Sequence, residues 1–352
     1  MSSEPSRGWR ERPLVQLTLV RYREFFREPE ALFWVFIFPI LLAAGLGIAF
    51  RNRPAAISHV AVTADTTGAL LKALTADSAL EARALDDSTA ARELRTGRVA
   101  LVVRSTGDNA VEFQFDDTRP EGQAARLLVD RAVQRAAGRA DPVGTRDALI
   151  REPGSRYIDF VVPGLLGMNL MGSGIWGIGF AVVEARRKKL LKRLIATPMS
   201  RAQYLASFLL SRLTMLVIEV ALLLGFGVLA FGVPLRGSWG ALAMICLLSS
   251  LCFGGLGLLI ASRPRTIEGA SGLMNLVMLP MWIFSGVFFS SSNFPRAFQP
   301  FIKALPLTAA IDALRANMLE GATLSQITPQ LGILSAWLVL GFVVAVKIFR
   351  WK

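Results

Sequence analysis

Five long runs without a charged side chain restrict the fold of this chain more than any other feature. They cover 31–50, 160–183, 237–262, 269–295 and 321–346. A sixth run, 213–235, is interrupted only by Glu219. An α-helix of roughly 20 apolar residues is long enough to cross the hydrocarbon core of a bilayer. We therefore expect an α-helical integral membrane protein with six transmembrane helices, which places both termini on the same side.

The net charge of +13 raises the question of nucleic-acid binding, and its distribution argues against that function. Residues 51–157 hold 16 Lys and Arg against 15 Asp and Glu. The segments 1–30, 184–201, 263–268 and 347–352 together hold 18 basic residues, whereas the short loops on the opposite side hold 4. Basic residues gather in the cytoplasmic loops of membrane proteins. The excess charge therefore predicts cytoplasmic termini and no nucleic-acid partner.

Residues 51–157 separate the first two apolar runs, and we expect them to form a small α/β extracytoplasmic domain. The pattern predicts strands at 59–63, 99–103 and 111–115, and helices at 67–74, 89–95 and 123–137. In the last of these helices, Leu127 and Leu128 are expected to face inward. His59 is the only histidine of the chain, which excludes a multi-histidine metal site.

A basic amphipathic stretch, EARRKKLLKRLIATPMSR at 184–201, connects the second and third runs. Because proline disfavours helical geometry in the preceding residue, Pro198 is expected to stop the helix at Thr197. The stretch is therefore predicted to be a short cytoplasmic helix that can present charge and an apolar stripe to a partner. The alternative is a charge cluster that only retains the loop in the cytoplasm. The stripe consists of Leu190, Leu191, Leu194 and Ile195.

Residues 1–30 precede the first span and contain a second amphipathic pattern. Its apolar stripe is Val15, Leu19, Tyr22 and Phe26, and its basic face includes Arg23 and Arg27. This pattern is typical of a helix that lies in the membrane interface with basic side chains toward anionic headgroups. The alternative is that it only anchors the first span, which Pro39 is expected to kink.

Polar side chains within the apolar runs indicate either a translocation path or contacts between helices. Asn169 and Ser173 are four residues apart and share a face of the second span, which is rich in small residues that allow close helix packing. Arg212 and Glu219 are seven apart, on roughly one face. A structural pair is favoured there over a proton relay through Glu219. Asn275 of the fifth run is the remaining candidate for the path.

The segment 294–319 is apolar but contains Pro295, Pro300 and Pro306, so it cannot span the membrane. We expect short helices that enter the outer leaflet, where protein covers their backbone groups. Asp312 and Arg315 are expected to pair at i, i+3. The predicted outer gate comprises Phe294, Phe298, Pro306, Asp312 and Arg315.

No phosphate-binding loop of the form G-x-x-x-x-G-K-[ST] occurs in the chain. The layout resembles the ABC type-2 export permeases, in the branch with a large external domain between the first and second spans. The motifs that carry the resemblance are Glu184 followed by KKLLKRLIATPMSR, LPLTAAIDALRANMLEG at 305–321 and, more weakly, ELRTGRVALVV at 93–103.

The resemblance implies a non-enzymatic permease subunit of an ATP-driven exporter in a bacterial cell (inner) membrane. In that family the counterpart of 184–198 is a coupling helix that docks on a separate ATPase, which binds the ATP and Mg. The helix before the first span also approaches that ATPase. We expect a homodimer of this chain with two copies of the ATPase. The chain is expected to bind no cofactor of its own and to move a hydrophobic or amphiphilic cargo. The coupling positions are Glu184, Arg187, Lys188, Leu191, Leu194, Thr197 and Pro198.

Two other functional classes remain open from the sequence. A membrane sensor would use the external domain as its ligand receptor, and a neighbouring gene for a kinase or regulator would favour it. A secondary transporter needs an ion or proton site near the middle of the membrane, and Glu219 is the one candidate.

Overall fold

The computed structural model of the protein describes residues 13–51, 57–65, 67–106, 110–139, 153–188, 201–264 and 266–348. These residues fall into two compact units. The helical unit combines Met1–Arg51 with Ile150–Lys352, and the inserted unit is Asn52–Leu149.

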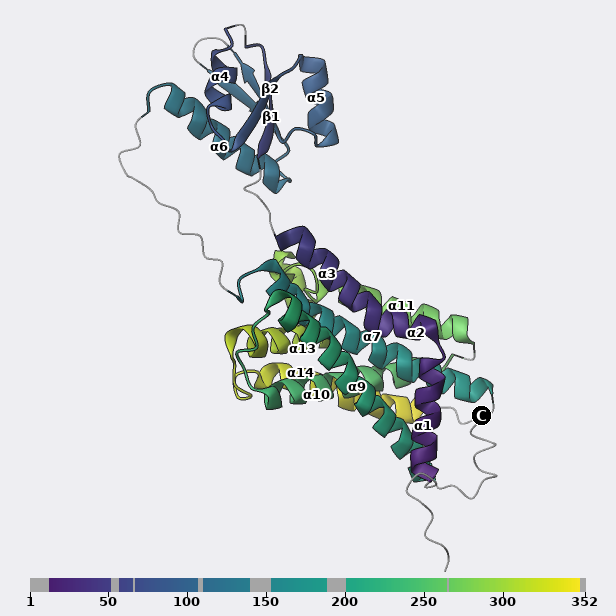
Figure 1. Cartoon of the computed structure of the whole chain (residues 1–352). Coiled ribbons are helices and arrows are strands. Elements are labelled where there is room, and N and C mark those ends of the chain that lie inside the picture. The colour runs from purple at the N-terminus through teal and green to yellow at the C-terminus, as the bar shows by residue number, and fades with distance from the viewer. Residues whose placement is uncertain are drawn as a thin grey trace, which may run out of the picture. The chain divides into compact units, whose positions relative to one another are not determined.

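Six helices of the helical unit are long and apolar enough to cross a membrane, as predicted. The chain is therefore a multi-pass membrane protein. Figure 1 shows these helices side by side, with the second, fourth, fifth and sixth drawn as α7, α10, α11 and α14. The third is the apolar part of α9, Arg201–Phe231. The six spans are Pro29–Phe50, Tyr157–Arg187, Leu210–Phe231, Trp239–Ala261, Ile267–Phe284 and Thr328–Ile348.

The boundaries of the last two spans differ from those of the apolar runs. Helix α11 ends at Phe284, well before the end of the run 269–295. Gly286 follows with φ +77°, a conformation that glycine adopts without the strain of a Cβ, so the chain turns there. The last span begins at Thr328 instead of 321, because Gly321, also with positive φ, ends the preceding element.

The first span contains a π-helical turn just before Pro39, where a kink was predicted. It runs through α2 (Pro29–Leu32), the π-helix η2 (Phe33–Ile37) and α3 (Phe38–Arg51). The Phe38 N–H donates to the Phe33 carbonyl, five residues back. Because Pro39 has no N–H to continue the α-helical pattern, the wider turn before it accommodates the missing donor.

Helix α7 is the centre of the helical unit, and it packs closely on α10. Cβ atoms built at Gly174 and Gly257 would lie 2.7 Å from the Phe253 Cβ and the Ile175 carbonyl oxygen, respectively. Small residues in α7 therefore serve close helix packing within this chain. Helices α7 and α10 each bury 61% of their most apolar window, whereas the first and last spans bury 17%.

The inserted unit contains a four-stranded sheet in the order β2-β1-β3-β4. Strands β1 (Ser58–Thr63), β2 (Leu80–Ala84) and β3 (Leu101–Ser105) are parallel, and β4 (Val111–Gln114) is antiparallel to β3. Alternate side chains of β1 and β3 face two separate cores. Helices α4 (Ala69–Thr75) and α6 (Pro120–Ala136) cover one face and α5 (Asp87–Thr96) the other. Its location outside the cytoplasm remains a prediction.

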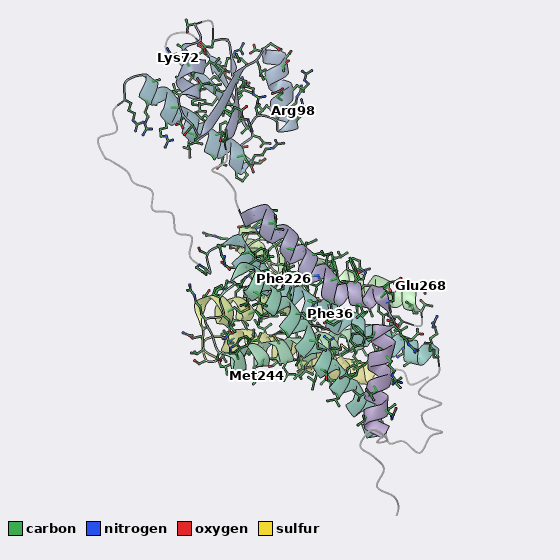
Figure 2. The ribbon with its side chains drawn as sticks, viewed as in Figure 1. Phe36, Lys72, Arg98, Phe226, Met244 and Glu268 are labelled. Atoms are coloured by element: carbon green, nitrogen blue, oxygen red, sulfur yellow. The ribbon has the colours of Figure 1, made fainter. Side chains whose placement is uncertain are left out.

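Two details of the inserted unit differ from expectation. Strand β2 was not predicted, because its sequence LEARA is too polar to look like a strand. Leu127 is 65% exposed, so the prediction that it faces inward is wrong; α6 instead buries Ala125 and Val129. Charged side chains such as Lys72 and Arg98 project from this unit, whereas Phe226 belongs to the helices of the other unit (Figure 2).

Candidate functional site

The predicted coupling stretch is described only at its two ends. Glu184 Oε1 lies 3.0 Å from Arg187 Nη2 and 2.9 Å from Lys188 Nζ, one helical turn further on. These three predicted coupling residues thus form an ion-pair cluster at the end of α7. The other predicted positions lie outside the described residues: Leu191, Leu194, Thr197 and Pro198.

Arg186 has a role that the sequence did not indicate. Its guanidinium donates hydrogen bonds to the carbonyl oxygens of Ala261, Ser262 and Pro264, at 3.2–3.3 Å. The last carbonyls of a helix have no partner within that helix, and Arg186 supplies donors at the end of α10. This basic residue therefore connects the end of α7 to the loop between α10 and α11.

Helix α1 (Pro13–Phe26) lies beside α9 (Figure 1), and its predicted apolar stripe is divided. Thr18 is buried and Val15 and Tyr22 are half-buried, at helical spacing, so these residues form the inner face. Leu19 and Phe26 are exposed at 37% and 55%. The basic residues of the predicted outer face, Arg23 and Arg27, are both exposed. The described helix therefore has an apolar surface left for lipid or a partner.

A buried polar cluster joins α7 to α9 in the interior of the helical unit. Arg212 Nη1 lies 3.3 Å from Glu219 Oε1, and Arg212 Nη2 donates to Ser173 Oγ at 2.8 Å. The Ser173 hydroxyl donates in turn to Glu219 Oε2 at 2.8 Å. The expected pairing of Arg212 with Glu219 is confirmed, and Ser173 completes the triangle. These contacts therefore link α7 and α9, the helices on either side of the coupling stretch.

The other two polar candidates do not join this cluster. Asn169 is buried one turn before Ser173, and no partner for its amide is found among the described residues. Asn275 is exposed near the middle of α11, next to Leu276, which is 70% exposed. An exposed amide at that depth in a span needs protein or water beside it. The face of α11 that carries Asn275 is therefore unsuited to hydrocarbon alone.

The predicted outer segment is a series of short helices, as expected, but its two halves differ in burial. Its first half comprises the 3₁₀ turn η4 (Arg296–Phe298) and the helix α12 (Gln299–Ala304), and another 3₁₀ turn, η3 (Ser291–Asn293), precedes it. Phe298 is 51% exposed, and its ring stacks at 6.4 Å on Phe284, the last residue of α11. Phe294 contacts the same ring at 5.0 Å.

The second half begins with helix α13 (Pro306–Arg315), which starts at a proline whose missing N–H needs no partner at that position. The residues from Pro306 to Ile311 are all buried. The π-helix η5 (Ala316–Glu320) follows and contains Asn317, whose buried amide has no partner among the described residues. The buried half therefore has no room to move without disturbing its neighbours.

The predicted pairing of Asp312 with Arg315 is wrong. The Arg315 guanidinium lies 3.5 Å from the centre of the Phe160 ring and donates to the Phe160 carbonyl at 3.1 and 3.2 Å. Its Nη2 also donates to the Gly286 carbonyl at 2.6 Å. No hydrogen bond or ion pair of Asp312 occurs within the described ranges. Burial lowers the pKa of Arg315 to about 10, which leaves the side chain charged at neutral pH.

These contacts fasten α13 to the first turns of α7 and to the turn after α11. The backbone also comes close there, because a Cβ at Gly164 would lie 2.5 Å from the Val287 carbonyl oxygen. Arg315 binds backbone carbonyls of two distant segments instead of the Asp312 carboxylate one helical turn away. The side-chain spacing in the sequence could not indicate this.

The described part of the helical unit contains buried polar links between helices. No cluster of three or more metal-binding side chains is found in the part of the chain that the structure describes.

A sequence model of the family described as "ABC-2 family transporter protein" matches residues 29–347. That range runs from the first span into the last and includes the inserted unit.

The chain also matches individual proteins, each at low identity and over only part of its length. The chain is 28% identical over 232 residues to ABC transporter G family member 20 of Dictyostelium discoideum, which is 64% of this chain and 31% of that protein. It is 29% identical over 177 residues to Linearmycin resistance permease protein LnrN of Bacillus subtilis (strain 168), covering 49% and 45%. For Inner membrane transport permease YadH of Escherichia coli (strain K12) the values are 24% over 170 residues, 47% and 64%. The chain thus spans less than two thirds of each of these relatives.

Proposed function

This chain belongs to the ABC-2 family of transporter proteins, and we propose on that premise that it is the permease subunit of an ATP-driven exporter. It moves a hydrophobic or amphiphilic compound out of the cytoplasm or the inner leaflet. The observation that carries the proposal is the family match over 29–347, which takes in the spans, the inserted unit and the outer segment. The family implies an ABC ATPase as partner, and we assign ATP and Mg to that separate chain.

The proposed coupling runs through the stretch between α7 and α9. Movement of the ATPase, present in two copies, pushes on the basic helix at 184–198. The cluster of Ser173, Arg212 and Glu219 supports the proposal, because it links the two spans that flank this stretch. Two copies of this chain enclose the path. The protein lies in a bacterial inner membrane, with both termini in the cytoplasm.

The proposed path lies along the faces of α7 and α11 that carry Asn169, Ser173 and Asn275. Asn275 supports this assignment, since an exposed amide in mid-span has to be covered by a second copy or by water. One relative is named for linearmycin resistance, which agrees with an amphiphilic cargo. The test is to reconstitute the chain with its ATPase and measure ATP hydrolysis with amphiphilic and with small hydrophilic compounds. Stimulation only by hydrophilic compounds would refute the cargo class.

We expect Glu219→Gln to leave transport intact and without a new dependence on pH. Glutamine keeps one oxygen, which can accept from Arg212, and its NH2 group can donate to Ser173 Oγ, but it cannot carry a proton. The measurement is the rate of ATP-driven transport across a range of pH values. If this variant is inserted normally but does not transport, Glu219 carries protons and a secondary transporter is the better account.

We expect the exposed half of the outer segment to move away from the buried half when nucleotide binds to the ATPase, so that Leu305 at their junction becomes accessible. Cysteine replaces Phe298 in one variant and Leu305, which is 9% exposed, in another, both with Cys246 and Cys252 changed to serine. A membrane-impermeant thiol reagent should label position 298 in all states, and position 305 faster when a nucleotide is trapped on the ATPase. Equal rates at 305 with and without the nucleotide would make the segment a static plug.

A further inference from the structure

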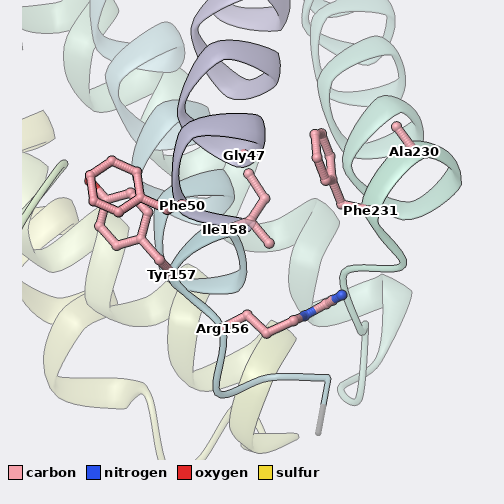
Figure 3. A pocket seen from close by; sticks show the side chains of 7 residues that line it. All are labelled: Gly47, Phe50, Arg156, Tyr157, Ile158, Ala230 and Phe231. Atoms are coloured by element: carbon pink, nitrogen blue, oxygen red, sulfur yellow. The ribbon is translucent and has the colours of Figure 1, made fainter. Parts of the chain in front are cut away.

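A cavity of about 200 Å³ lies where the last turns of α3 and α9 meet the first turn of α7 (Figure 3). Figure 3 shows Phe50 and Tyr157 on one side, Phe231 on the other and Arg156 between them at the rim. The rings of Phe50 and Tyr157 are 4.1 Å apart. We call this space the collar cavity. It is lined by Gly47, Phe50, Arg156, Tyr157, Ile158, Ala230 and Phe231.

At the collar cavity the carboxylate of Asp159 is buried, whereas Arg156 has a hydrogen-bond donor that remains available. The Asp159 side chain is 0% exposed and accepts from the N–H groups of Gly154 and Arg156. It also accepts from Arg156 Nε and Nη2, at 2.9 and 2.8 Å. Arg156 Nη2 donates to the Gly232 carbonyl as well, at 3.1 Å. The other terminal nitrogen, Nη1, has no acceptor among the described residues.

A second guanidinium lies beside the same loop. Arg236 Nη2 donates to the Pro153 carbonyl at 2.9 Å, and a Cβ at Gly154 would lie 3.4 Å from that nitrogen. None of the ion pairs of the described residues includes Arg236. Two cations and one covered carboxylate therefore surround the loop at 153–159, so the local charge favours an anion.

The walls of the cavity continue into exposed apolar surfaces of two membrane spans. Ile48 of α3 is 70% exposed and Leu229 of α9 is 89% exposed, and both belong to membrane spans. Aromatic and basic residues at the ends of spans lie at the level of the lipid headgroups. At about 30 Å³ per water-sized group, the cavity can hold a phosphate and a short stem, but not a large cargo molecule.

We propose that the collar cavity binds the headgroup of an anionic phospholipid, with its phosphate accepting hydrogen bonds from Arg156 Nη1 and its acyl chains along α3 and α9. The ligand is a resident lipid, so the inference does not depend on the identity of the cargo or on export. A bound headgroup would connect the three helices that meet at the point where the sequence enters and leaves the inserted unit.

The experiment uses the full chain in phosphatidylcholine vesicles with a trace of spin-labelled phosphatidylglycerol or spin-labelled phosphatidylcholine. Electron paramagnetic resonance measures the fraction of each lipid immobilised by the protein. We expect a several-fold preference for phosphatidylglycerol. Excess inorganic phosphate should abolish this preference without changing the contact with phosphatidylcholine, because the phosphate group is the part recognised.

Two variants test the location. Gly47→Leu blocks the cavity by pushing the Phe231 ring of its wall out of place, since a Cβ there would lie 2.5 Å from that ring, and Gly45→Leu is its control, because a Cβ at Gly45 meets nothing within 4 Å. We expect only Gly47→Leu to lose the preference. Arg156→Gln combined with Asp159→Asn removes both charges while keeping hydrogen-bonding groups, and it should lose the preference with an unchanged thermal midpoint.

Three outcomes would overturn the proposal. One is equal immobilisation of the two lipids by the wild-type chain. Another is a preference that survives in both Gly47→Leu and the charge-neutral double variant. The third is calorimetric binding of inorganic phosphate without any lipid preference, which would assign the cavity to a free anion.

Discussion

Arg212→Met should destabilise the helical unit more than any other single change considered for this chain. It leaves the Glu219 carboxylate, which is 2% exposed, without its cation in the interior. Removing one partner of a buried ion pair costs roughly 3–5 kcal/mol, because the remaining charge is uncompensated. The measurement is the thermal unfolding midpoint of the protein purified in detergent, which we expect to fall by several degrees.

The double variant Arg212→Met with Glu219→Leu is the matched control. It removes both charges and fills the space with apolar side chains, a replacement that is often neutral or stabilising in protein interiors. We therefore expect its midpoint to return close to that of the wild type. A single variant as stable as the wild type would show that the pair makes no net contribution.

Leu191→Glu together with Leu194→Glu should abolish co-purification of the ATPase. Both residues belong to the apolar stripe of the basic stretch, and charges placed there would be buried against the partner. A central contact of this kind costs about 2 kcal/mol or more, which is roughly a 30-fold loss of affinity. The measurement is the amount of ATPase retained with the tagged permease, with membrane insertion shown to be normal.

Lys189→Gln together with Lys192→Gln separates docking from a purely topological role. If the stretch only retains the loop in the cytoplasm, these changes alter the orientation and the leucine changes have no effect on the ATPase. If the stretch docks on the ATPase, the lysine changes leave the orientation unchanged and the leucine changes reduce the amount of ATPase retained. Full ATPase retention by the leucine variant would rule out the stripe as the contact.

The sequence was sufficient for the six spans and for the pairing of Arg212 with Glu219 within α9. The apolar runs predicted all six helices because nothing but a span accommodates so many uncharged residues. Arg212 and Glu219 were predicted to pair because both lie on α9, where spacing determines which side chains share a face. The end of α11 was not predicted, since Ser285 and Gly286 look like any other small residues of an apolar run.

Long side chains that bind distant backbone groups were beyond reach of the sequence. Arg186 contacts carbonyls some 75 residues away, and Arg315 contacts Phe160 and Gly286 instead of Asp312. Arginine can reach several acceptors at once, and a buried carbonyl leaves no trace in the side-chain pattern. The docking residues at 189–200 lie outside the described part of the chain, so their roles rest on the sequence and the family.

The most direct test of the export function is cargo uptake into sealed inside-out vesicles that contain this chain and its ATPase. We predict accumulation of a fluorescent amphiphile that requires ATP hydrolysis and both subunits, is lost in the Leu191→Glu, Leu194→Glu variant and persists when the proton gradient is collapsed. Uptake that follows an imposed proton gradient without the ATPase would contradict the account.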